Sequence, residues 1–288
     1  MKITSISIDL GKTRFHLVAV DHHGKIIVQK KFSRKQRLAF TANLPSALIG
    51  IEAGSGAHFI GAALRNQGHD VRLIPAQFVK SFVKSNKNDC VDAEAIAEAV
   101  ARKNMRCVPI KTDDQLDLQA LHRVRDRLVH RRTAVINPIR GFLLERGIVF
   151  AKGPANLRNP TPSLLEDAEQ SITPRMRKLY DHLWQEWKAL DSDIEGVSQE
   201  IDTIASQDAA CQRLRQIPGV GPLVSTATVA AIGNGAAFRK GREFAAWLGL
   251  IPRQHSSGAR HVCSASANAE AFICAACSST AHARCCCG

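Results

Sequence analysis

The chain is poor in aromatic residues, and it has no long uninterrupted run of apolar residues. Aromatic side chains make up 5% of its 288 residues, and there is a single tyrosine. Stacking of nucleobases on exposed rings is therefore not expected as its main binding mode. Without an apolar run of about 20 residues we expect no membrane-spanning helix and no membrane partner. Residues 1–4 lead into an expected strand without a signal peptide, which predicts a cytoplasmic protein.

Acidic residues are scarce relative to basic ones. The sequence holds 39 Lys and Arg against 26 Asp and Glu, which gives a formal net charge of +13. Such an excess favours a polyanionic partner, because lysine and arginine contact phosphates and release their counterions. The composition therefore points to a nucleic-acid-binding protein, and the alternative is a soluble protein that is merely basic.

Cysteine is also sparse over most of the chain. Only Cys90, Cys107 and Cys211 lie before residue 258, and we expect them to be reduced thiols. The other six cysteines fall in residues 259–288, where Arg260 and Arg284 are the only Lys or Arg residues. Such an abrupt change of composition is typical of a reading-frame shift and predicts an aberrant, disordered tail. The alternative is a zinc site at Cys274, Cys277, His282 and Cys285, although these residues lack a regular paired spacing.

Four carboxylates stand where a metal-dependent nuclease needs them. Asp9 and Glu52 each close an apolar run, and Asp89 and Asp92 begin a stretch typical of a helix. The i, i+3 spacing puts the last two on one helix face. Oxygen ligands of this kind suit Mg²⁺, which predicts a catalytic magnesium site. Taken singly, Asp9 could belong to a turn and Asp89 could be a helix N-cap.

The order of expected elements over residues 1–112 is that of an α/β domain of the RNase H-like class. Three strands, near 3–9, 15–20 and 25–32, follow one another as an antiparallel meander. A fourth strand carries Glu52, a helix follows over 57–67, and a fifth strand covers 70–75. A meander followed by alternating strands and helices is typical of RNase H-like (RuvC-like) folds.

Residues 113–147 are expected to form a basic helix, and a link rich in Pro and Asn separates it from a second helix. Apolar residues from Leu183 to Ile204 then alternate at spacings of four and three, which favours a helical hairpin or a coiled coil. This second helix could pack on the first or on another subunit. The candidate nucleic-acid contacts of the basic helix are Arg123, Arg125, Arg127, Arg131, Arg132 and Arg140. A solvated charged face is the alternative interpretation of these arginines.

A glycine turn, Pro218-Gly219-Val220-Gly221-Pro222, precedes an apolar helix and is similar to a helix-hairpin-helix. The backbone N–H groups around Gly219 and Gly221 are candidate phosphate ligands.

Together these motifs resemble the DEDD transposases of the IS110 group of insertion sequences, most closely its IS1111-like branch, which are relatives of the Piv invertase. The resemblance rests on the four carboxylates, residues 118–125, the glycine turn, and residues 249–258, Gly-Leu-Ile-Pro-Arg-Gln-His-Ser-Ser-Gly. It implies a RuvC-like DEDD domain (1–112), a basic helix and coiled-coil insert (113–208) and a mainly α transposase domain (209–258). The Cys-rich tail (259–288) departs from the family.

The resemblance also implies a function. Proteins of this group are DNA recombinases that use Mg²⁺, a serine nucleophile and a structured guide RNA, called the bridge RNA. The serine would be Ser256 or Ser257 here, and Ser257, next to Gly258, is favoured. Their subunits combine, so a homo-oligomer (dimer or tetramer) that binds element ends and target DNA is expected.

Two alternatives and one departure accompany this interpretation. The chain could be an inactive nucleic-acid-binding remnant of a transposase. Residues 9–13, Asp-Leu-Gly-Lys-Thr, also resemble the first phosphate loop of a sugar-kinase-like ATPase. Pro138 interrupts the basic helix, where the family has none, and predicts a kink or a new helix start.

Overall fold

The structure is a computed structural model that describes residues 3–11, 15–82, 89–102, 104–159, 172–250, 253–257 and 260–264. Within this part, the side chains at positions 34, 35, 37, 89 and 90 and beyond residue 250 are not described. The chain divides into two compact units, one made of residues up to 115 and from 231 onward, the other of residues 116–230. Each unit is described by itself.

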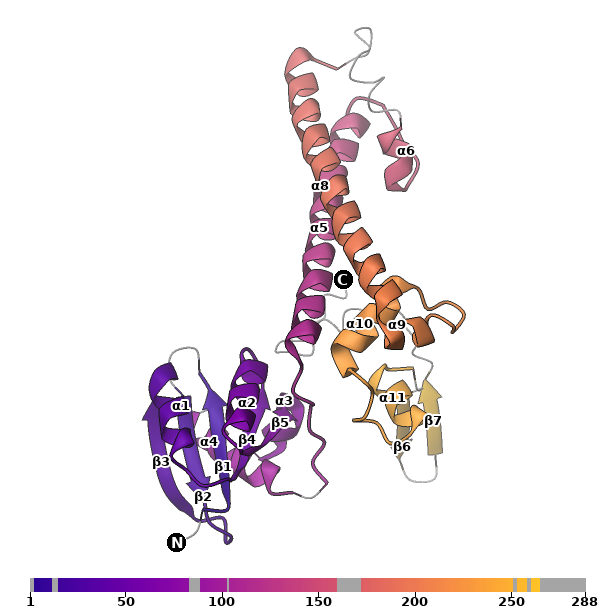
Figure 1. Cartoon of the computed structure of the whole chain (residues 1–288). Helices are drawn as coiled ribbons and strands as arrows, with labels where there is room; N and C mark the ends of the chain where they lie inside the picture. Colours follow the sequence, from indigo (N-terminus) through magenta and orange to yellow (C-terminus); the bar gives the residue numbers. More distant parts are fainter. Residues whose placement is uncertain are drawn as a thin grey trace. The chain divides into compact units, whose positions relative to one another are not determined.

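The first unit is built on a five-stranded mixed sheet (Figure 1). Its strands in chain order are β1 (Ser5–Leu10), β2 (Phe15–Val20), β3 (Ile26–Phe32), β4 (Leu48–Ala53) and β5 (Asp70–Pro75). They lie side by side in the order β3-β2-β1-β4-β5; β3, β2 and β1 pair antiparallel, and β1, β4 and β5 pair parallel. This confirms the expected meander followed by parallel strands, and the architecture fits an α/β RNase H-like domain.

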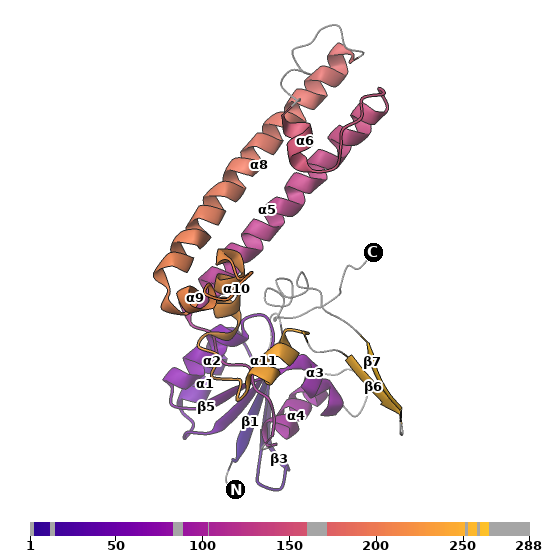
Figure 2. The same cartoon turned by 90° about the vertical axis from the view of Figure 1, so that its right-hand side faces the viewer.

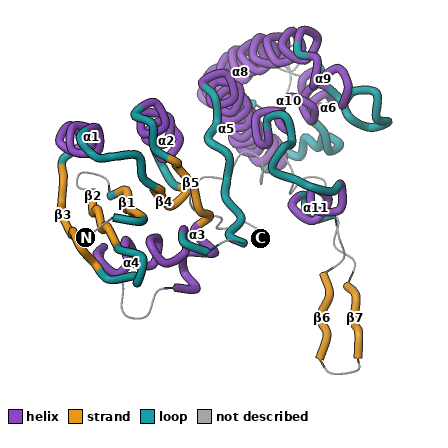
Figure 3. Tube along the Cα trace, turned by 60° about the horizontal axis from the view of Figure 1, so that its bottom comes forward, coloured by secondary structure: helices purple, strands orange, loops and turns teal. Residues whose placement is uncertain are grey.

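Helices cover both faces of this sheet (Figure 3). Helices α1 (Arg34–Ala42) and α2 (Ala57–Asn66) lie on one face, and α4 (Asp89–Val100) lies on the other. The short α3 (Ala76–Val79) and the 3₁₀ helix η1 (Lys80–Phe82) lead away from β5. Helix α1 was not predicted; it begins after Ser33, whose N–H donates to Gln36 Oε1 at 3.1 Å, a contact that fixes the first turn.

Alternation along the strands decides which side chains meet which helix. Ile6, Ile8, Ile49 and Ile51 belong to the same buried cluster as the apolar residues of α2. The residues between them face α4, and the clearest of these is Gly50. A Cβ atom at Gly50 would lie 2.8 Å from Val100 Cβ and 3.1 Å from Ile96 Cγ2, so α4 rests directly on the strand backbone.

The second unit is helical. Its elements in chain order are α5 (Asp113–Leu144), α6 (Pro154–Arg158), α8 (Pro174–Gln207), α9 (Ala209–Leu214) and α10 (Pro222–Ile232), of which α5 and α10 cross the unit boundaries. Both α5 and α8 are long, and they lie side by side in Figures 1 and 2. They run antiparallel, because Arg125 contacts Ser198 while Arg131, which lies further along α5, contacts Glu186, which lies earlier on α8.

The apolar repeat of α8 forms the core of this helix pair. Trp187, Leu190 and Tyr180 are buried against residues of α5 such as Ile139 and Leu143. Of the two partners that the repeat left open, the structure shows the basic helix of the same chain. The coiled coil itself stays a prediction.

Pro138 neither ends α5 nor starts a new helix. The helix runs unbroken from Asp113 to Leu144 with the proline inside it, so the expected new start at this position is wrong. Ile136 and Ile139 on either side are buried in the core shared with α8. We attribute the continuity to this packing, which offsets the backbone hydrogen bond that proline cannot donate.

Beyond α10 the structure describes helix α11 (Gly241–Trp247) and a hairpin of β6 (Arg253–Ser257) and β7 (Arg260–Ser264). Residues 260–264 therefore differ from the expected disordered tail, because their backbone pairs with β6. The proposed zinc ligands Cys274, Cys277, His282 and Cys285 lie outside the described residues. Within the described part of the chain, no helix is long and apolar enough to cross a membrane.

Candidate active site

Two of the four predicted carboxylates occupy neighbouring positions in the sheet. The last paired residues of the parallel strands β1 and β4 are Ile8 and Ile51, and Asp9 and Glu52 come next on each strand. Neighbouring strands are about 4.8 Å apart, and residues at the same level point to the same face. Asp9 and Glu52 are both half-buried, so strand register brings them together at one edge of the sheet.

Helix α4 lies on the face that carries these carboxylates. Glu52 is paired with Ile74 of β5, and Ile74 packs in one cluster with Ile96 of α4. Asp92 is half-buried and stands four residues before Ile96, on the same side of the helix. Asp89 is the first residue of α4, and its side chain is not described.

The described carboxylates Asp9, Glu52 and Asp92 do not form a closed cage by themselves. Among the side chains that the structure describes, no group of three or more His, Cys, Asp or Glu residues has the spacing of a metal site. The arrangement therefore consists of a strand pair, Asp9 and Glu52, faced by a helix that carries Asp92. Its donors are all carboxylate oxygens, which are the ligands that hard divalent ions prefer.

Sequence reasoning missed two residues that continue this line of side chains. His16 of β2 is directly opposite Asp9, and Lys31 of β3 is directly opposite His16. Directly opposite residues in antiparallel strands share a face. Glu52, Asp9, His16 and Lys31 thus form a row across β4, β1, β2 and β3, which we call the polar row. A count from the turn at residues 21–24 would have paired His16 with Lys30, because the register of β2 and β3 shifts between Ala19 and Val20.

Several of the candidate arginines of α5 contact groups within the helical unit. Arg125 Nε donates to Ser198 Oγ at 2.9 Å, and Arg140 Nη2 donates to the Gly153 carbonyl at 2.6 Å. Arg131 forms an ion pair with Glu186 at 3.3 Å, and Arg132 forms one with Asp191 at 3.1 Å. Arg123 and Arg127 are exposed, and they are the candidates best placed to meet a nucleic acid.

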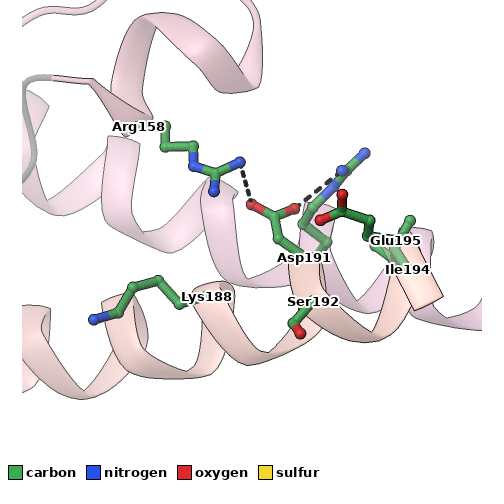
Figure 4. A pocket seen from close by; sticks show the side chains of 7 residues that line it. Arg158, Lys188, Asp191, Ser192, Ile194 and Glu195 are labelled. Atoms are coloured by element: carbon green, nitrogen blue, oxygen red, sulfur yellow. Dashed lines mark hydrogen bonds and ion pairs between the residues drawn. The ribbon is translucent and has the colours of Figure 1, made fainter.

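A pocket of about 330 Å³ lies beside these ion pairs (Figure 4). Arg132 and Arg158 both bind Asp191, one at each carboxylate oxygen, at 3.1 and 3.2 Å. Lys188 and Glu195 complete its charged lining. Because its carboxylate binds both guanidinium groups, Asp191 acts as a clamp that links α8 to α5 and α6.

The glycine turn lies directly before α10, as predicted. Gly219 has φ +86°, a conformation that glycine adopts without strain. On α10, the Thr226 hydroxyl donates to the Pro222 carbonyl at 2.7 Å and lies 3.0 Å from Nε2 of His122 on α5. Burial lowers the pKa of His122 to about 4, and the charge of Arg125 contributes. A neutral imidazole therefore links α10 to α5.

The two candidate nucleophiles lie at the end of β6. Ser256 is paired with His261, and Ser257 is paired with Arg260 across the hairpin. Residues adjacent in a strand alternate in face, so the two serines occupy non-equivalent register positions. Arg260 is thus the basic residue at the level of Ser257.

Two stretches of the chain match protein families. Residues 6–147 match the transposase family of DEDD type named for IS110, and residues 211–282 match the family described as "Transposase IS116/IS110/IS902 family". The chain is 41% identical over 262 residues to a probable family 20 transposase of Pseudomonas aeruginosa, covering 90% of this chain and 77% of that protein. The chain belongs to the IS110 family of transposases.

Other relatives agree with this membership. The transposase for insertion sequence element IS1111A of Coxiella burnetii is 39% identical over 260 residues, 90% of this chain and 71% of that protein. A pilin gene-inverting protein of Moraxella bovis is 25% identical over 194 residues, 66% of this chain and 51% of that protein. The first family match includes all four carboxylates, and the second includes both serines and continues past Gly258.

Proposed function

We propose that this member of the IS110 family is a DNA recombinase whose strand-transfer chemistry depends on a divalent ion held by Asp9, Glu52, Asp89 and Asp92. The observation that carries the proposal is the register of β1 and β4, which puts Asp9 beside Glu52 on the face covered by α4. These residue types at a sheet edge are suited to hold an ion against a phosphodiester.

The described residues are compatible with Mg²⁺ as the ion. All four ligands are carboxylates, and clustered carboxylates repel one another unless a cation lies between them. Bound Mg²⁺ would stabilise the negative charge that develops on phosphate oxygens. Asp9 and Glu52 would hold fixed positions because their strands pair on both sides, whereas Asp89 and Asp92 would follow any shift of α4.

We further infer that Ser256 or Ser257 is the nucleophile. Its oxygen would bond to phosphorus while the bond from phosphorus to the leaving strand breaks, and the hydroxyl proton would pass to a base. The pairing of Ser257 with Arg260 favours Ser257, since a cation at this level would offset the developing charge. A guide RNA and a homo-oligomer that completes the site remain proposals that rest on the family.

Nucleic-acid binding would draw on the excess of basic residues. The exposed Arg123 and Arg127 of α5 and the backbone N–H groups at Gly219 and Gly221 are the proposed phosphate contacts. Arg125, Arg131, Arg132 and Arg140 would take part only if nucleic acid displaces the partners that they contact within the helical unit.

A second candidate function is nucleic-acid binding without strand exchange. It is favoured by residues 259–288, which contain six of the nine cysteines and only two basic residues. The sugar-kinase-like alternative is disfavoured by family matches that span residues 6–147 and 211–282.

A strand-cleavage assay separates the two candidates. The substrate is DNA carrying the ends of the cognate element, supplied with its guide RNA and either Mg²⁺ or a chelator. A recombinase should yield Mg²⁺-dependent product that is lost in Asp9→Asn and in either Ser257→Ala or Ser256→Ala. The matched control is Glu94→Gln, an exposed carboxylate on the same α4, which should retain activity. Binding without product in the unaltered chain would favour the second candidate.

A further inference from the structure

A pocket that the proposed chemistry does not use lies at the end of the polar row formed by His16 and Lys31. This pocket has a volume of about 300 Å³ and is lined by His16, Val18, Gln29, Lys30 and Lys31. No carboxylate is among these lining residues, whereas the other end of the row consists of Asp9 and Glu52. The row therefore changes from acidic to basic across four adjacent strands.

Register fixes how far apart these groups lie. His16 separates Asp9 from Lys31, and each neighbouring pair is directly opposite. Two strand spacings put the Cα of Lys31 about 10 Å from that of Asp9. Gln29 pairs with Val18 and so lies two residues along β3 from Lys31, on the same face. Lys31 and Gln29 of β3 thus lie beside His16 and Val18 of β2 on the same face of the sheet, and His16 and Val18 are both buried.

Lys30, the residue before Lys31, lies on the other face of the sheet. Its ammonium nitrogen lies 5.1 Å from the ring centroid of Phe40, which belongs to α1 on the opposite side of the sheet. Lys30 and Lys31 are adjacent, exposed and equally charged, yet only Lys31 continues the row that contains Asp9. Strand alternation therefore supplies an internal control for any effect of charge.

We propose that Lys31 and Gln29, which lie beside His16, bind one backbone phosphate of a DNA strand. The neighbouring phosphate of the same strand would lie at Asp9 and Glu52. An ammonium group and an amide are suitable donors for one phosphate, and phosphate contacts of this kind fix the register of a strand without reading its sequence. This subsite rests on the proposed function, because the strand it positions is the one at the carboxylates. Its role is positioning, and no bond is made or broken at Lys31.

Lysine footprinting with a fluorescein-labelled single-stranded DNA tests the subsite directly. The full chain is acylated with a small ester reagent in the presence and absence of DNA, in buffer that contains Mg²⁺, and the modified lysines are quantified by mass spectrometry. We expect DNA to protect Lys31 several-fold and to leave Lys30 unchanged. Equal labelling of Lys31 with and without DNA, or equal protection of both lysines, would overturn the proposal.

Binding measurements on variants supply the second arm. The change Lys31→Ala should lower the affinity for DNA. It should also make the slope of the logarithm of the binding constant against the logarithm of salt concentration less negative by about one unit, as expected for one lost phosphate contact. Lys30→Ala should leave the slope unchanged, and Lys31→Arg should restore it. Thermal melting of all three variants checks that each folds.

The subsite and the metal site can fail separately. If Asp9→Asn abolishes the response to Mg²⁺ but the two lysines behave alike, the subsite is wrong and the metal site stands. If Lys31 alone is protected but Asp9→Asn leaves the Mg²⁺ response unchanged, the phosphate contact stands and the proposed metal site is wrong.

Discussion

The two units of this transposase use their charged residues in different ways. In the first unit, charged side chains gather in the polar row on four adjacent strands of one sheet, of which β4, β1 and β2 are paired on both sides. In the helical unit, many charged side chains bind one another, and Asp191 alone holds both Arg132 and Arg158. The sheet concentrates charge at a candidate site, whereas the helix pair uses charge to hold itself together.

The difference teaches that a count of basic residues does not locate a binding surface. Arg131 and Lys31 carry the same charge, but Arg131 contacts Glu186 of α8 while Lys31 lines a pocket without acidic residues. Position in a strand register is a better guide than charge, because register fixes which side chains lie next to a residue on the same face of the sheet.

Removing the largest buried side chain should destabilise the helical unit and leave the stability of the sheet unchanged. Trp187 is 1% exposed in the core between α5 and α8. We expect Trp187→Ala to lower the free energy of unfolding of this unit by about 3–5 kcal/mol, the usual cost of deleting a buried aromatic ring. Denaturant unfolding followed by circular dichroism measures it, and Leu179→Ala, which alters an exposed residue of the same helix, is the control. A similar loss in both variants would contradict the packing described here.

Acid should destabilise both units, because each contains a buried neutral histidine. Burial lowers the pKa of His58 to about 4, helped by the charge of Lys111, as it lowers that of His122. The unfolded chain takes up protons below about pH 6.5, whereas the folded chain does so only near pH 4. Stability is therefore complete above pH 6.5 and decreases as the pH falls toward 4, by up to about 3 kcal/mol for each histidine.

Thermal melting between pH 7 and pH 4 measures this loss. Because carboxylates also titrate in this range, the informative comparison is with His122→Gln, which retains a group able to bond Thr226. We expect the variant to lose less stability over the same interval. An identical pH profile in the two proteins would show that His122 is not held neutral.

Adding a single methyl group at Gly50 should disturb the candidate site through α4. A Cβ atom there would lie 2.8 Å from Val100 Cβ, and overpacking of this kind costs about 1–3 kcal/mol. We expect Gly50→Ala to lower the melting temperature and to weaken the response to Mg²⁺, because Asp89 and Asp92 move with the helix. Gly54→Ala is the matched control, since its Cβ would come no closer than 3.9 Å to the Glu52 carbonyl.

Neutralising the clamp residue of the helical unit should have the smallest effect on stability. Asp191→Asn removes two ion pairs whose groups are partly exposed, so we expect a loss of about 1 kcal/mol. The same change releases Arg132 and Arg158, and affinity for DNA should rise if their present partners keep them from phosphate. The exposed Asp193→Asn is the control for charge alone. A fall in DNA affinity specific to Asp191→Asn would indicate that the clamp itself forms a binding site.

Local patterns predicted the sheet and part of the site. Asp9 and Glu52 each close an apolar strand, and parallel neighbours that end at one edge bring such residues together. His16 was missed because its place depends on the register between β1 and β2, and Lys31 because the register of β2 and β3 shifts between Ala19 and Val20; alternation alone gives neither register. The partners of Arg131 and Arg132 lie 55 and 59 residues away on α8, and no local pattern encodes such distant pairings.

The central claim is that Asp9 and its neighbours hold a divalent ion, and thermal melting during a Mg²⁺ titration tests it most directly. An ion that binds only the folded chain stabilises it by about 2.7 kcal/mol at a concentration 100 times its Kd. We predict that the melting temperature rises with Mg²⁺ in the unaltered chain and in Glu94→Gln, and that the rise shrinks in Asp9→Asn. The same rise in all three proteins, or no rise in any of them, would contradict the claim.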